Sequence, residues 1–200
     1  DVKDSTSLDI GKGGKYAKYA SGEVDGMTVG VPVELIKGID KNVLEPFESS
    51  MEQMKEKGCT IKEITLPSLE KAVAAYYIIA MSEASSNLAR YDGVRYGVAS
   101  GFGGDWNQMF SASRKIGFGK EVKRRILLGT YVLSAGYQDR YYAKAQRVKA
   151  WVRKEFENAF KEVEVVASPT MPVLPFKLGE GEKDPLKMYL SDSNTVPVNL

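Results

Sequence analysis

The clearest chemical signal in the sequence is an arginine at the border of an apolar run. Arg125 closes a basic cluster that also holds Lys120, Lys123 and Arg124, and it directly precedes Ile126–Leu128. On a helix, an arginine in this setting can point into a cleft, where its planar fork suits a carboxylate better than a lysine does. The alternative is that the whole cluster is a solvated helix face.

Two tyrosines and one aspartate are the other polar candidates. Tyr76 and Tyr77 lie within the apolar stretch Ala72–Met81; they are either core aromatics whose hydroxyls find a partner, or one of them faces a pocket. Asp192 falls at the end of a predicted short helix, where a carboxylate opposes the helix dipole. Residues in locally unfavourable positions are candidates for function, and the alternative is an exposed acid.

Several classes of chemistry are excluded by composition. The chain has no histidine, so Ser-His-Asp and Cys-His catalysis and imidazole-based zinc sites are absent. A single cysteine, Cys59, allows no internal disulfide and reads as a small buried hydrophobe. The formal net charge of +2 is too small to indicate nucleic acid or an anionic membrane as a partner.

The short sequence motifs do not indicate a nucleotide-binding or metal-binding site. The glycines and lysines of residues 11–15 lack P-loop spacing, residues 101–104 lack dinucleotide spacing, and no cluster of metal ligands is visible. Ser168-Pro169-Thr170 follows a predicted strand. Because ligands gather at the carboxyl ends of strands in α/β sheets, this loop is either a pocket wall or a structural proline-rich connection.

The elements that position these residues predict an α/β fold, rich in helices. Strands are expected at 27–31, 59–66 and 163–167. Helices are expected at 41–57 (capped by Asp40), at 68–91 (capped by Ser68), at 138–160 and at 185–192 (capped by Asp184). Between the second and third of these, a short helix begins after Asp105 and a further helix ends at Gly136. The first strand, helix and second strand form a βαβ unit with parallel strands. We expect a mixed sheet flanked by helices and incomplete in itself.

The ends of the chain suggest a piece of a longer polypeptide. The chain begins at Asp1 without an initiator methionine and stops within the apolar run Thr195–Leu200. We expect residues 1–26, rich in Gly, Lys and Ser, to be a linker or loop continuing from a missing N-terminal part. Residues 27–200 are expected to be part of a single domain truncated at both ends, and no membrane helix is predicted.

Six segments resemble the amidase signature family, and within it the A subunits of glutamyl-tRNA(Gln) and aspartyl-tRNA(Asn) amidotransferases. The match spans essentially the whole chain, and the middle segments are the most specific. They are Asp4–Ser7, Tyr76–Gly97, Gly117–Tyr137, Ser168–Thr170, Asp184–Tyr189 and Thr195–Leu200.

The resemblance implies a glutamine clamp but no nucleophile. In that family the catalytic triad is Ser-Ser-Lys, which agrees with the absence of histidine. The triad lies upstream of Asp4–Ser7, so this chain is expected to be inactive alone. By alignment, Tyr76, Arg125 and Asp192 match the family's substrate-contacting residues. Arg125 would pair with the α-carboxylate of glutamine, Asp192 with its α-ammonium, and Tyr76 would form a hydrogen bond.

The resemblance also implies partners. The full-length subunit would release ammonia from glutamine and pass it to subunits B and C of a cytoplasmic complex. The partner subunit would use ATP and magnesium to amidate glutamate or aspartate on tRNA, so tRNA is reached through the complex and the chain itself needs no cofactor.

Three departures and two rival interpretations remain. Ser193 and Asn194 stand where the family usually has apolar residues, and the loop 99–107 and residues 10–15 also differ. The rivals are a stand-alone amidase acting on small amides, and a non-catalytic scaffold or RNA-contacting module that uses the basic helix faces around Lys123-Arg124 and at 144–154.

Overall fold

A small parallel sheet lies at one end of the molecule. The structure, a computed structural model, describes residues 3–4, 6–8, 16–20, 22–99, 101, 104–179 and 185–200. Strands β1 (Thr28–Pro32), β2 (Thr60–Ile64) and β3 (Val165–Val166) form a sheet in the order β2-β1-β3. Both pairings are parallel, with Val29 opposite Ile61 on one side and Val165 on the other. The predicted α/β, helix-rich fold is therefore confirmed, and both strand pairings seen within the described residues are parallel, without the antiparallel pairing that would make this part of the sheet mixed.

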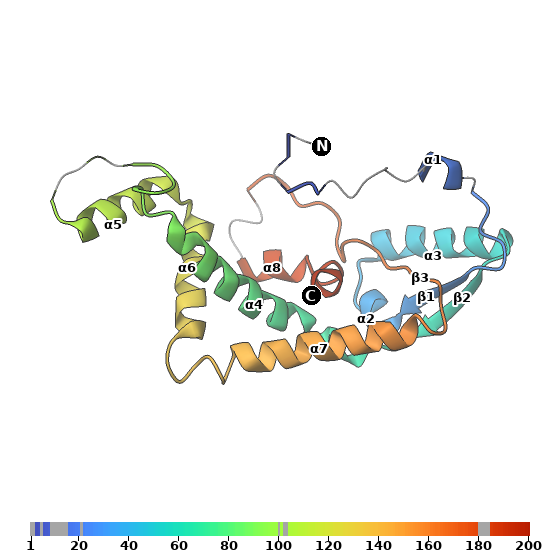
Figure 1. The fold of residues 1–200 in the computed structure, drawn as a ribbon. Helices are drawn as coiled ribbons and strands as arrows, with labels where there is room; N and C mark the ends of the chain where they lie inside the picture. The colour runs from blue at the N-terminus through green and yellow to red at the C-terminus, as the bar shows by residue number, and fades with distance from the viewer. Residues whose placement is uncertain are drawn as a thin grey trace.

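The predicted βαβ unit is confirmed. Along the chain, a helical turn, α2 (Val33–Ile36), and helix α3 (Lys41–Glu56) connect β1 to β2. The carboxylate of Asp40 accepts a hydrogen bond from the backbone N–H of Asn42 at 2.8 Å, which makes it the predicted N-cap. Helix α3 lies on one side of the sheet and α7 (Tyr142–Ala159) on the other (Figure 1).

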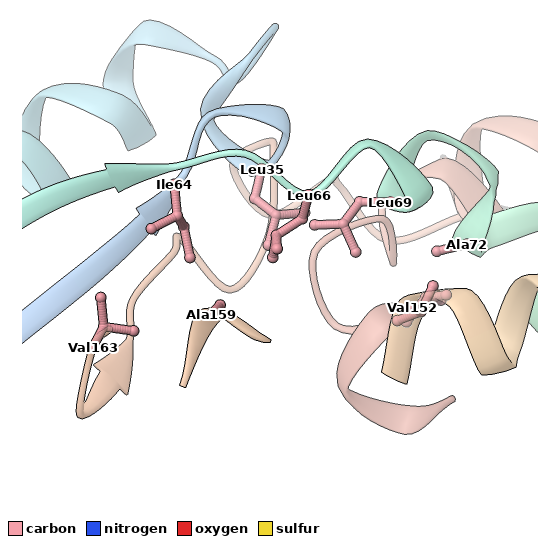
Figure 2. Packing of buried hydrophobic residues seen from close by; sticks show 9 residues of the cluster. Leu35, Ile64, Leu66, Leu69, Ala72, Val152, Ala159 and Val163 are labelled. Carbon is pink, nitrogen blue, oxygen red and sulfur yellow. The ribbon is translucent and has the colours of Figure 1, made fainter. Parts of the chain in front are cut away.

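The main core lies where β2 ends against α7. Figure 2 shows Ile64, Leu66 and Leu69 facing Val152 and Ala159 of α7, and all five are buried. Two carboxylates fasten the segment that follows β2. Glu34 accepts the backbone N–H of Leu66 at 2.9 Å, and Glu155 accepts both the N–H and the hydroxyl of Ser68, the latter at 2.5 Å. These bonds satisfy buried donors that would otherwise be costly.

In the structure, three separate elements take the place of the long helix predicted over 68–91. A 3-10 turn, η1 (Pro67–Lys71), precedes α4 (Ala72–Asn87), and a second turn, η2 (Leu88–Arg90), follows it. Ser68 does not cap α4, because that helix begins at Ala72 with Lys71 at its N-cap, and the hydroxyl of Ser68 donates to Glu155. Helix α5 (Trp106–Gly117) is capped by Asp105 as predicted, and α6 (Lys120–Leu133) comes next.

The C-terminal segment returns to the centre of the molecule (Figure 1). It contains α8 (Pro185–Leu190) and the 3-10 turn η3 (Val196–Asn199), so the last helix ends two residues before Asp192. Residues 1–26 contain a helical turn, α1 (Tyr16–Tyr19). The predicted cap Asp184 and the glycine-lysine stretch 11–15 lie outside the described residues.

Helices α4 and α6 pack unusually closely because α6 carries a glycine at the contact. A Cβ atom added to Gly129 would lie 1.9 Å from the carbonyl oxygen of Met81 and 2.7 Å from Cβ of Ser85. The hydroxyls of Ser85 and Thr130 are 2.9 Å apart along the same contact. The two helices therefore meet backbone to backbone at this point, which only glycine permits.

The chain exposes more surface than a compact protein of its size. Its accessible surface is 14228 Å² for a mass of 22.0 kDa, whereas a globular monomer of that mass exposes about 9,300 Å². Large apolar side chains such as Leu174, Leu186 and Val198 are at least half exposed. In the part of the chain that the structure describes, no helix is both long and apolar enough to cross a membrane.

We predict that Gly129→Ala destabilises the chain by about 1–3 kcal/mol, the usual effect of forcing a methyl group into a filled contact. Alanine would otherwise favour an interior helix position by about 1 kcal/mol over glycine. Urea unfolding followed by circular dichroism measures the change. Gly117→Ala is the matched control, because nothing lies within 4 Å of its added Cβ. If Gly129→Ala unfolds at the wild-type urea concentration, the close contact between α4 and α6 is wrong.

Candidate functional site

Two of the three predicted clamp residues meet around Tyr77, from elements far apart in the sequence. The hydroxyl of Tyr77, on α4, donates a hydrogen bond of 2.6 Å to Oδ2 of Asp192, which follows α8. The guanidinium carbon of Arg125, on α6, lies 6.0 Å from the centre of the Tyr77 ring. A cation, an anion and a hydroxyl are thus gathered at the junction of three helices.

The close packing of α4 and α6 explains how Arg125 reaches Tyr77. Arg125 lies four residues before Gly129, and Tyr77 lies four residues before Met81. Because four residues are about one helical turn, the two side chains lie one turn from the glycine contact, on the same sides of their helices. The close backbone approach at Gly129 therefore also brings the side chains of Arg125 and Tyr77 near each other.

Two further residues complete the cluster. Oε1 of Glu121 accepts hydrogen bonds from Nε of Arg125 at 3.0 Å and from the hydroxyl of Tyr189 at 2.6 Å. The Tyr189 ring packs against that of Tyr77, with centroids 4.3 Å apart. We call the five residues Tyr77, Glu121, Arg125, Tyr189 and Asp192 the junction cluster.

The surroundings of Tyr77, Glu121 and Arg125 keep these three groups in defined protonation states. Burial raises the pKa of Tyr77, and the hydrogen bond to Asp192 raises it further, so the phenol stays protonated and remains a donor. Burial acts to raise the pKa of Glu121, but hydrogen bonds from Tyr189 and Arg125 outweigh it and leave this pKa below its ordinary value. The hydrogen bond to Glu121 raises the pKa of Arg125, which stays charged.

Tyr76 is placed differently from its neighbour. Its ring meets that of Tyr77 edge-on, with centroids 5.2 Å apart, and it packs against the main core. The side chain is half-buried. The structure thus brings together Arg125, Asp192 and Tyr77, with Tyr76 beside them, and a role for Tyr76 in binding substrate stays a prediction.

The three consecutive basic residues of α6 face different surroundings. Nζ of Lys123 donates to the carbonyl oxygen of Lys115 at 2.8 Å and borders a groove of about 480 Å³ between α5 and α6. Arg124 points to solvent and pairs with Oε2 of Glu121 at 2.5 Å. Arg125, in contrast, faces Tyr77 of α4 and bonds to Glu121 of its own helix. The basic cluster is therefore not one solvated face.

A buried amide holds the segment that carries Asp192. Asn194 is 5% exposed, and its Nδ2 donates to the carbonyl oxygens of Leu35 at 2.9 Å and of Pro169 at 2.8 Å. This ties Asp192 to α2 and to the loop Ser168–Thr170 that follows β3. That loop therefore lies next to the candidate site, as its position after a strand suggested.

Sequence reasoning missed Glu121, Tyr189 and the role of Asn194. Glu121 carried a usable signal, since it lies four residues before Arg125 and such pairs meet on one helix face. Asn194 had none, because its two acceptors are 159 and 25 residues away. Within the described ranges, no group of three Cys, Asp or Glu side chains is placed to hold a metal ion.

Comparison with known proteins identifies the family. The profile of the amidase family matches residues 1–200. Over its full length the chain is 58% identical to the glutamyl-tRNA(Gln) amidotransferase A subunits of Natronomonas pharaonis and of Halobacterium salinarum. It covers 48% of the Natronomonas protein and 47% of the Halobacterium protein. The chain thus spans about half the length of the curated relatives it matches.

Solved structures agree with the sequence comparison. The crystal structure of another of these A subunits, from the glutamyl-tRNA(Gln) amidotransferase of Thermotoga maritima, matches with a TM-score of 0.63 and 35% identity, over 88% of this chain and 34% of that one. A bacterial aryl acylamidase of the amidase signature family matches at 14% identity and a TM-score of 0.59, over 88% of this chain and 33% of that one, which shows the shared fold alone. Its sequence throughout, and its fold over most of its length, place this chain in the amidase family.

Proposed function

We propose that the chain is part of the glutamine-hydrolysing subunit of a tRNA-dependent amidotransferase, and that it holds the α-amino acid end of glutamine. The observation that carries the proposal is the meeting of Arg125 and Asp192 around Tyr77 from three separate helical segments. The relatives at 58% identity are named glutamyl-tRNA(Gln) amidotransferase A subunits, which supports this class of reaction.

The chemistry of the two charged residues suits the two ends of an α-amino acid. Arg125 presents N–H donors in a plane, which match a carboxylate. Asp192 uses one oxygen to accept from Tyr77, and a carboxylate has acceptor sites to spare for an ammonium group. Holding both α-groups would fix the side-chain amide in one place, which is the orientation part of catalysis.

The rest of the proposed reaction takes place outside these 200 residues. A Ser-Ser-Lys triad elsewhere in the full-length subunit would attack the side-chain amide and release ammonia. Partner subunits B and C of a cytoplasmic complex would use the ammonia, with ATP and magnesium, to amidate glutamate or aspartate carried on tRNA. The chain would meet tRNA through the complex rather than directly.

The two rival functions gain nothing from the structure. A stand-alone amidase would not need the α-group clamp, and the solved amidases below 25% identity support only the fold. An RNA-contacting module would use the basic cluster of α6 as one surface, yet Lys123 and Arg125 face different sides of that helix.

We predict that the purified 200-residue chain releases no ammonia from glutamine, because the proposed nucleophile is not in it. A coupled glutamate dehydrogenase assay measures ammonia, with the full-length complex as the positive control. Ammonia release above the enzyme-free rate would show that the chemistry resides in these residues.

In the full-length complex, Arg125→Ala should lower kcat/KM for glutamine roughly tenfold to a hundredfold. A charge-assisted hydrogen bond to the α-carboxylate contributes about 1.5–3 kcal/mol. Arg125→Lys should restore activity only in part, since a point charge cannot reproduce the fork. Lys123→Ala is the matched control and should be mild, because Lys123 bonds to Lys115 and not to the junction cluster. Equal losses at Arg125 and Lys123 would mean that general charge, not a clamp, matters.

The two tyrosines have separate proposed roles that phenylalanine substitutions distinguish. Tyr77→Phe removes the donor to Asp192 and should lower kcat/KM for glutamine about tenfold, while glutarate monoamide, which lacks the α-ammonium, should be affected less. Tyr76→Phe should lower the use of both substrates, if Tyr76 binds substrate as the alignment predicts. A harmless Tyr77→Phe would contradict the support that we assign to Asp192.

A further inference from the structure

Glu121 occupies a position that the binding of glutamine alone does not explain. It lies next to the arginine proposed to receive a carboxylate, and it is itself a carboxylate. A negative group beside an anion site lowers the affinity of that site unless it has another role. The contacts of Glu121 indicate what that role is.

The first contact concerns which edge of Arg125 is left to face a ligand. Glu121 accepts from Nε of Arg125 at 3.0 Å. An arginine can bind a carboxylate through Nε and one terminal nitrogen, or through its two terminal nitrogens. With Nε engaged by Glu121, the two terminal nitrogens are the edge left to face a ligand. A long side chain with many rotamers is thereby held in one orientation before substrate arrives.

The second contact holds Glu121 itself. The Tyr189 hydroxyl donates to the same Oε1 at 2.6 Å, and the Tyr189 ring lies against Tyr77. Tyr189 is on α8, and Asp192 follows it by three residues. The carboxylate that orients Arg125 is therefore bonded to the segment that carries Asp192, and both halves of the proposed clamp share one support.

The charge of Glu121 is offset locally. Its other oxygen, Oε2, accepts from Nη1 of Arg124 at 2.5 Å. Two guanidinium groups thus surround one carboxylate, and Glu121, Arg124 and Arg125 taken together carry a net positive charge. This removes the objection that Glu121 would repel the α-carboxylate.

We propose that Glu121, held by Tyr189, is a positioning residue that presents the two terminal nitrogens of Arg125 to the α-carboxylate of glutamine. The inference rests on the proposed function. It adds that specificity for α-amino acids depends on a carboxylate and a tyrosine that need not touch the substrate.

The test uses the full-length subunit in its complex, with the variants Glu121→Ala, Glu121→Gln and Tyr189→Phe. Each is assayed with glutamine and with 4-aminobutanamide, which is glutamine without its α-carboxylate. Glu121→Ala should lower kcat/KM for glutamine roughly tenfold, the scale of coupling between residues in contact, mainly through KM. Glu121→Gln keeps an oxygen for Nε and should recover part of the loss. Use of 4-aminobutanamide should stay near the wild-type rate.

The double variant Glu121→Ala/Arg125→Ala should be no worse than Arg125→Ala alone, because Glu121 acts through Arg125. Equal losses with both substrates would assign Glu121 a merely structural role and overturn the proposal. Loss in Arg125→Ala without loss in Glu121→Ala would overturn the positioning role and leave the proposed function intact. Failure of the wild-type complex to hydrolyse glutamine would overturn both.

Discussion

The backbone contact between Gly129 and Met81 is the constraint on which the candidate site depends. Helices with side chains at their interface pack with axes about 8–10 Å apart, and glycine at a contact allows a closer approach. Here the distance from an added Cβ to the Met81 oxygen would be 1.9 Å, so no other residue fits without movement. One turn away, the same approach brings Arg125 over the ring of Tyr77. The absence of a side chain at Gly129 thus allows Arg125 to lie close to Tyr77.

The second determinant is a set of long-range polar bonds that hold the C-terminal segment. The short helix α8 has six residues and would not be stable alone, since isolated helices below about 12 residues are marginal in water. Tyr189 bonds to Glu121, Asp192 accepts from Tyr77, and Asn194 bonds to Leu35 and Pro169. These contacts reach α6, α4, α2 and the loop after β3. These hydrogen bonds order the C-terminal segment and position Asp192 at the site.

Contacts between residues close together in the sequence could be predicted, and contacts between residues far apart in the sequence could not. Asp40 and Asp105 cap their helices as predicted, because a cap involves residues two or three positions apart. Ser68 was expected to do the same and does not, because α4 begins only at Ala72, and the Ser68 hydroxyl donates instead to Glu155, 87 residues away. Arg125 and Asp192 were singled out by local pattern and by resemblance. Glu121 could have been found from its spacing to Arg125, whereas Tyr189 and Asn194 act through distant contacts that no short pattern encodes. The parallel pairing of β1 with β2 could be predicted because a helix connects them, whereas the pairing of β1 with the distant β3 could not.

The direct test of the central claim is where the α-groups of glutamine lie. A crystal structure of the full-length subunit, inactivated at its nucleophile and soaked with glutamine, measures this. We expect the α-carboxylate at about 2.7–2.9 Å from the terminal nitrogens of Arg125, and the α-ammonium at hydrogen-bonding distance from Asp192. Glutamine bound with its α-carboxylate on another residue, and Arg125 still paired only with Glu121, would contradict the proposed clamp.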